Sequence, residues 1–159
     1  AQNLPDIDGM VIVTTPQDVA LLDSRKSITF ANSLKVDVIG VIENMSGYTV
    51  RGKAPSGTEI ELAAPGGKTI RVTADEEGHW FGTLDIFKSG GGEKTAEEFG
   101  VPFLGKLPFD PGFVRGGDDG VHRIVSEPEG ASSQAFANVV AEIQTRVESG
   151  STDGGLEII

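Results

Sequence analysis

Two short segments place polar side chains where strands of an α/β sheet would end. Asn44 follows the apolar run 36–42, and the segment 108–111 follows the apolar run 101–107. Open α/β sheets bind ligands beyond the carboxyl ends of their strands. The carboxamide of Asn44 offers a hydrogen-bond donor and an acceptor in one plane, and Asp110 can accept from a hydroxyl. Both segments are therefore candidate ligand contacts, although a strand-end turn and a rigid loop would use the same residue types.

Thiol chemistry is excluded because the chain has no cysteine. It can form no disulfide, no thiolate nucleophile and no thiolate-held metal site. The two histidines, His79 and His122, are each isolated, which is more typical of surface or packing residues than of metal ligands. No Ser–His–Asp triad and no pair of catalytic carboxylates follows from the spacing.

Length and charge narrow the class of protein. A chain of 159 residues suits one domain, and a net charge of -11 argues against nucleic acid, which is bound by clustered lysines and arginines. No run approaches the roughly 18 apolar residues of a membrane span, and no charged and then apolar leader opens the chain. We therefore expect a cytoplasmic protein with neither a nucleic-acid nor a membrane partner.

Short, continuous apolar runs are typical of strands in a parallel sheet. The chain has three of them, at 10–14, 36–42 and 101–107. The first is expected to be buried on both faces. Helices are expected at 16–34 and 93–99, and Gly100 can end the second with a left-handed cap. Because a crossover helix makes the strands on either side of it parallel, the predicted fold class is α/β, a parallel sheet with flanking helices.

The apolar residues of the two longer helices follow different patterns. In the helix at 16–34, one face holds Leu21, Ile28 and Ala31, while Val19, Phe30 and Leu34 lie elsewhere, so this helix is expected to be contacted on two sides. The last helix has a single stripe and is expected to start at Ser132 or Ser133 as N-cap. The stripe consists of Phe136, Val139, Val140, Ile143 and Val147. Residues 149–159 are expected to form a flexible tail.

A β-rich insert separates the two α/β parts. Between residues 50 and 84, apolar and polar residues alternate around glycine-containing turns, which predicts an inserted β-meander or hairpin region. About 35 residues are too few for the seven strands of an immunoglobulin-like sandwich. Trp80 and Phe81 are the residues of the insert best suited to contact a partner if they are exposed.

Four ordered motifs resemble the Mrp/ApbC family of P-loop ATPases, which carry iron–sulfur clusters. They are Thr-Thr-Pro-Gln-Asp-Val-Ala-Leu-Leu-Asp-Ser-Arg-Lys at 14–26, Val-Ile-Gly-Val-Ile-Glu-Asn-Met-Ser at 38–46, the glycine-rich stretch 85–94, and Gly-Val-Pro-Phe-Leu-Gly-Lys-Leu-Pro-Phe-Asp-Pro at 100–111. The resemblance covers residues 1–49 and 85–148. It implies a partial P-loop NTPase-like parallel sheet, with ATP as cofactor and Asn44 beside the adenine. Pro108, Phe109 and Asp110 would then wall the base and ribose.

The chain departs from that family in two ways. It has no Walker A loop, since the glycine-rich stretch at 90–94 lacks the Gly-Lys-Ser/Thr ending and is more typical of a helix start. The family's magnesium-binding aspartate would lie upstream of Ala1. The Cys-x-x-Cys with which family dimers hold a 4Fe-4S cluster is replaced by the insert. We therefore expect a truncated form that does not hydrolyse ATP alone. The Walker A lysine and the magnesium ion would supply most of the stabilisation of the charge that develops on the transferred phosphoryl group.

Two hypotheses of different classes follow. The first is an ATP-binding iron–sulfur cluster carrier, which would act as a homodimer or with a missing N-terminal half and would serve iron–sulfur client proteins. The alternative is a non-enzymatic interaction module, in which a degenerate ATPase half-domain supports the β insert. Nucleotide binding discriminates between the two.

Overall fold

The computed structural model describes residues 7–153, and its centre is a three-stranded parallel sheet. The strands β1 (Met10–Thr14), β2 (Val38–Glu43) and β7 (Phe103–Lys106) lie in the order β1-β2-β7. Thr14 pairs with Glu43, and Glu43 pairs with Lys106, so the carboxyl ends of all three strands lie at one edge of the sheet. The predicted fold class and the three predicted strands are confirmed.

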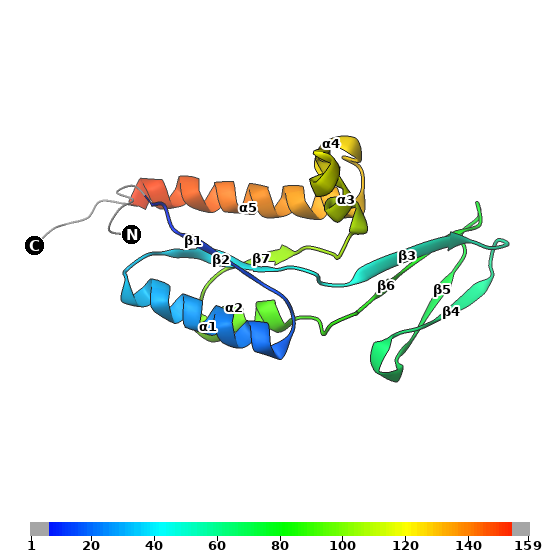
Figure 1. Cartoon of the computed structure of the whole chain (residues 1–159), viewed down its shortest axis with the longest axis horizontal. Coiled ribbons are helices and arrows are strands. Elements are labelled where there is room, and N and C mark those ends of the chain that lie inside the picture. The colour runs from blue at the N-terminus through cyan, green and yellow to red at the C-terminus, as the bar shows by residue number, and fades with distance from the viewer. Residues whose placement is uncertain (1–6, 154–159) are drawn as a thin grey trace, which may run out of the picture.

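Helices cover both faces of this sheet (Figure 1). The helices α1 (Asp18–Ser33) and α2 (Gly91–Phe99) lie on one face, and α5 (Ala131–Asp153) lies on the other. The short helices α3 (Pro111–Asp119) and α4 (Arg123–Ser126) follow β7 and pack near the start of α5. Each face has its own core cluster. One contains Ile12, Ile28, Val41 and Ala96, and the other contains Ile42, Leu104 and Val139.

Within the described residues the helix α1 packs on the strands β1 and β2 and beside the helix α2. Leu21, Ile28 and Ala31 are buried, as their shared face predicts. Four large apolar side chains outside this face are exposed, so within the described residues they do not make the second contact that the pattern suggested. These exposed side chains are Val19, Leu22, Phe30 and Leu34.

The edge strand β1 carries an unexpected exposed valine. Ile12 and Thr14 are buried, but Val13 is 58% exposed, so the prediction that both faces of this strand are covered is wrong. In the described residues β1 pairs with β2 alone, which leaves the backbone groups of its other edge without a neighbouring strand.

The insert is a β region, as predicted, but it is not a meander. Its strands are β3 (Tyr48–Lys53), β4 (Glu59–Ala63), β5 (Thr69–Thr73) and β6 (His79–Leu84), with a 3-10 turn at Pro65–Gly67. The outer strands β3 and β6 pair with each other, and the inner strands β4 and β5 pair with each other, both antiparallel. The first and last strands therefore form a ribbon that projects from the sheet and carries the second ribbon (Figure 1).

The helix ends differ from the prediction at α5. This helix begins at Ala131, so Ser132 and Ser133 lie within its first turn rather than at the N-cap. It continues to Asp153, so the predicted flexible tail is wrong for residues 149–153, and residues 154–159 lie outside the described part. The left-handed cap at Gly100 is confirmed, with φ 64°.

Candidate functional site

A small apolar cavity lies at the carboxyl ends of β2 and β7. Its volume is about 240 Å³. All four residues predicted to contact a ligand line it, although the segments that carry them are more than 60 residues apart in the chain. The lining consists of Asn44, Met45, Leu107, Pro108, Phe109, Asp110, Phe113, Val114, Ser132 and Phe136. The cavity has the position at which open α/β sheets bind ligands.

The backbone of β1 and a strained turn fix Asn44 at the cavity. Its N–H donates to the Thr14 carbonyl at 2.7 Å, and its Oδ1 accepts from the Met45 N–H at 2.9 Å. Met45 has φ 55°, a left-handed conformation that a methionine adopts only at some cost in free energy. Oδ1 keeps a second lone pair, and within residues 7–153 no hydrogen bond is formed by the Asn44 amide group. The carboxamide can therefore still donate to and accept from a planar ligand.

Aromatic rings supply the apolar walls, and sequence reasoning missed one of them. Phe113 of α3 stacks against Phe136 of α5, with ring centroids 6.1 Å apart and an interplanar angle of 30°. Phe136 was predicted only as a core position, and Phe113 was not singled out. Phe109 packs edge-on against Tyr48, with centroids 5.8 Å apart, and its N–H donates to the Gly47 carbonyl. The walls suit a flat, apolar ligand body.

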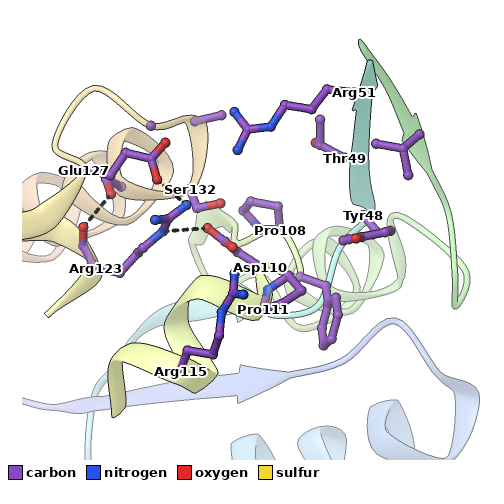
Figure 2. Close-up of a pocket in the computed structure, with 15 residues that line it drawn as sticks. Tyr48, Thr49, Arg51, Pro108, Asp110, Pro111, Arg115, Arg123, Glu127 and Ser132 are labelled. Carbon is purple, nitrogen blue, oxygen red and sulfur yellow. Dashed lines mark hydrogen bonds and ion pairs between the residues drawn. The ribbon is translucent and has the colours of Figure 1, made fainter. Parts of the chain in front are cut away.

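Asp110 holds the corner between β7 and α5. Its Oδ1 accepts from the Gly112 N–H at 2.7 Å and caps α3, and its Oδ2 accepts from Arg123 Nε at 3.2 Å (Figure 2). Burial alone would raise its pKa, but the hydrogen bonds from Gly112, Ser132 and Arg123 outweigh this effect, so the pKa of Asp110 lies below the ordinary value of 3.8. The carboxylate is therefore ionised, joins α3, Arg123 and Ser132 through hydrogen bonds, and also lines the cavity.

This lowered pKa makes the stability of the fold depend on pH. An aspartate with a depressed folded pKa stabilises the fold above its unfolded pKa, and this contribution is lost as the pH falls through the folded value. We expect Asp110→Asn to lower the free energy of unfolding at pH 7 by about 1–2 kcal/mol. The difference from the wild type should shrink below about pH 3.8.

Urea denaturation at a series of pH values measures this difference. Asp118→Asn, at an exposed position of the same helix, is the matched control and should change stability by at most about 0.5 kcal/mol. A constant difference between Asp110→Asn and the wild type from pH 7 to pH 2.5 would contradict the assignment.

Glu43, at the end of β2, is a buried carboxylate that sequence reasoning did not identify as a structural residue. Its side chain is 0% exposed. Its two oxygens accept from the Gly90 N–H at 3.1 Å, from the Gly92 N–H at 2.7 Å and from the Ser46 hydroxyl at 2.6 Å. The carboxylate thus binds the positive end of α2, where a negative charge is favourable.

The same contacts explain the glycine-rich stretch. Gly90 has φ 82° and precedes α2, which agrees with the interpretation as a helix start. A Cβ on Gly92 would lie 2.9 Å from Glu43 Cβ, so the close approach of helix and strand requires glycine there. Because Glu43 already occupies the N–H groups of Gly90 and Gly92, these groups are not available to a phosphate.

The described residues contain no metal centre and no membrane span. No group of three or more histidine, aspartate or glutamate side chains is placed to hold a metal ion within residues 7–153. His79 lies in the insert, with Nδ1 3.9 Å from an oxygen of Asp75, and His122 precedes α4. Within the same range, none of the helices has the length and apolar character needed to cross a membrane.

Comparison with known sequences identifies a family of P-loop NTPases to which this chain is similar. Residues 1–70 and 72–144 match the ParA family of sequences described as NUBPL iron-transfer P-loop NTPase. An iron-sulfur cluster carrier protein of Methanocaldococcus jannaschii is 36% identical over 147 residues, which are 92% of this chain and 41% of that protein. One from Synechocystis is 37% identical over 146 residues, 92% of this chain and 34% of that protein. The chain thus spans about two fifths or less of these relatives.

Solved structures show the same fold. The cell division ATPase MinD of Pyrococcus furiosus superposes with a TM-score of 0.54 at 18% identity, covering 87% of this chain and 43% of MinD. The septum site-determining protein MinD of Pyrococcus horikoshii, solved with Mg-ADP, gives a TM-score of 0.55 at 17% identity over 90% of this chain and 44% of that protein. At this level of identity the likeness establishes the fold alone.

Proposed function

Because this chain belongs to the family of NUBPL iron-transfer P-loop NTPases, we propose that it is the part of an iron–sulfur cluster carrier that binds the adenine base of ATP. The observation that carries the proposal is the cavity at the carboxyl ends of β2 and β7, which brings Asn44 together with Pro108, Phe109 and Asp110. Residues 1–49 and 85–148 form this nucleotide-binding part, and the insert is an addition to it.

The chemistry of the cavity fits a purine base. The adenine edge carries both hydrogen-bond acceptors and an amino donor. The unused lone pair of Asn44 Oδ1 and the N–H groups of its amide match that combination. Phe113 and Phe136 offer apolar surface to the ring faces. When bound, ATP would supply the phosphoryl group that an NTPase transfers. The residues of this chain bind and orient the base and exclude water from it.

The same chain does not fit the phosphates. It has no Walker A loop, and the N–H groups of its glycine-rich stretch are bonded to Glu43. We therefore propose that this chain alone does not hydrolyse ATP, and that a phosphate-binding half completes the site along the open edge of β1. The other backbone edge of β1 has no neighbouring strand within the described residues, which supports that arrangement.

The cluster itself is cargo in this proposal. A chain without cysteine has no thiolate for a 4Fe-4S cluster, so the cluster ligands belong to another part of the carrier or to an iron–sulfur client protein. Dimer formation and a cytoplasmic location remain predictions.

A second candidate function rests on the insert. Phe81 is 73% exposed on β6, as a contact residue of an interaction module would be. Trp80 is different, because its ring lies over Gly52, where a Cβ would come within 2.5 Å of it. Phe81 is therefore the residue of the insert that would contact a partner.

Adenosine binding tests the proposed function. We expect adenosine to bind with a dissociation constant on the order of 1 mM, since the cavity provides contacts to the base alone. Asn44→Ala should weaken this binding about 5- to 10-fold through the loss of one or two hydrogen bonds. The measurement is a calorimetric titration of the full chain.

Asn138→Ala, at an exposed position of α5, is the matched control and should leave adenosine binding unchanged. If the wild type and Asn44→Ala bound adenosine equally, or if the folded wild type did not bind it, the adenine site would be contradicted. The interaction module built on the insert would then be the better candidate function.

A further inference from the structure

A second cavity lies on the other side of the segment 108–111, between the insert and the start of α5. Its volume is about 360 Å³, which is within the range of small-molecule sites. One wall is the base of β3, from Tyr48 to Arg51, and the opposite wall is the corner formed by α3, α4 and α5 (Figure 2). The proposed function uses the neighbouring cavity and does not use this one.

Positive charge is concentrated in this cavity. The chain has a net charge of -11, yet three of its six arginines line the cavity. Arg123 forms ion pairs with both Asp110 and Glu127, so the lining holds three arginines against two carboxylates, a net formal charge of +1. The structure shows no ion pair and no side-chain hydrogen bond for Arg51 or Arg115 within residues 7–153. Two guanidinium groups are therefore available to a ligand.

The two available arginines come from separate elements. Arg51 extends from β3 toward the start of α5, and Arg115 extends from α3 toward Asp110 (Figure 2). Thr49 and Ser132 also line this space, and the Ser132 hydroxyl donates to Asp110. The first turn of the 23-residue helix α5 also lies in this wall, and its positive end adds to the two arginines.

We propose that this arginine-lined cavity binds a small organic phosphate, held by Arg51 of the insert and Arg115 of α3. Arg51 and Arg115, which have no ion pair within residues 7–153, can each donate to the oxygens of a phosphate monoester. The planar fork of N–H donors on each guanidinium group can bond to two phosphate oxygens at once. A carboxylate has only two oxygens and would leave more of the donors on the two arginines without an acceptor.

The position of Arg51 gives this site a second property. Arg51 lies on the insert, whereas Arg115 and the helix α5 belong to the nucleotide-binding part. A phosphate bound between them links the insert to that part. The site does not depend on the adenine cavity, because the two cavities share a wall but no arginine lines both.

Binding of glycerol 3-phosphate to the full chain tests the proposal. We expect titration at constant ionic strength to shift the Nε–Hε NMR signals of Arg51 and Arg115. Arg51→Gln and Arg115→Gln should each weaken binding at least about tenfold, as expected for the loss of a charge-assisted contact. Arg51→Lys, which keeps the charge and loses the fork, should fall between the wild type and Arg51→Gln.

Arg71→Gln is the matched control, because Arg71 is also an insert arginine but is paired with Glu61 outside the cavity. It should bind glycerol 3-phosphate like the wild type. Equal weakening by Arg71→Gln would reveal nonspecific charge attraction and overturn the proposal. Equally tight binding of glycerate would overturn the preference for phosphate, and unshifted Arg51 and Arg115 signals in the folded wild type would overturn the site. Adenosine binding is measured separately, so either proposal can fail alone.

Discussion

Replacing Glu43 with alanine should lower the free energy of unfolding by about 3–5 kcal/mol, a large part of the stability of a domain of this size. Glu43 is fully buried, and three donors depend on its oxygens. Alanine would leave the N–H groups of Gly90 and Gly92 without an acceptor and would open space between β2 and α2. Urea denaturation followed by circular dichroism measures the change.

Two further substitutions separate the hydrogen bonds of Glu43 from its volume and charge. Glu43→Gln keeps the shape of the side chain but replaces one accepting oxygen with an NH₂ group, which would face a backbone N–H of Gly90 or Gly92. Because two donors cannot bond to each other, this substitution should also lower the free energy of unfolding by more than about 1 kcal/mol. Glu93→Gln is the control: it removes the charge of an exposed glutamate of α2 that pairs with Lys106. It should lower the free energy of unfolding by less than about 1 kcal/mol. A loss of stability no larger for Glu43→Ala than for Glu93→Gln would show that the carboxylate does not hold α2.

Supplying a phosphate-binding half should raise the affinity for Mg-ATP at least about 100-fold over the chain alone, since phosphate and metal contacts would join those to the base. The half would carry a Walker A loop and would pair along the open edge of β1. Calorimetric titration of Mg-ATP into the chain and into the mixture measures this gain.

Val13→Lys tests the site of that pairing. Val13 is 58% exposed, so the substitution should change the stability of the isolated chain by less than about 0.5 kcal/mol. It should nevertheless reduce the gain in Mg-ATP affinity, because a lysine at this edge disfavours the approach of another strand. A gain unaffected by Val13→Lys would place the contact elsewhere, and no gain at all would contradict completion by a second half.

The family and the α/β part of the fold could be predicted from the sequence. The three strands are continuous apolar runs, and the crossover rule then fixes their parallel direction. Membership of the iron-carrier NTPase family, suggested by ordered motifs, is confirmed by the family match. The exposure of Val13 could not be predicted, because an apolar run indicates what can be buried and not which neighbours are present.

Of the two arrangements predicted for the insert, the structure has the hairpin and not the meander. All four of its strands alternate between inward and outward side chains, so the local pattern is the same for a meander and for two nested ribbons. The choice is made by long-range packing. Leu62 and Val72 of the inner ribbon lie against Gly82, which has room for them because it has no side chain.

The candidate site was predicted in part. Asn44 and the segment 108–110 converge as expected because both follow strands of one parallel sheet. The role of Phe113 could not be deduced, since its stacking partner Phe136 belongs to another helix, α5, and the sequence does not show which helices meet. Glu43 was missed because its partners Gly90 and Gly92 are 47 and 49 residues away in the chain. A buried carboxylate of this kind has no local sequence signal.

The most direct test of the adenine site is to observe where the base binds. We expect nuclear Overhauser effects between the adenine protons of adenosine and the ring protons of Phe113 and Phe136, accompanied by a shift of the Asn44 amide signals. Guanosine, whose edge has the opposite arrangement of donor and acceptor groups, should give much weaker effects. Contacts from adenine to residues outside this cavity, or no contacts with a folded chain at millimolar adenosine, would contradict the assignment of this chain as the base-binding part of a carrier.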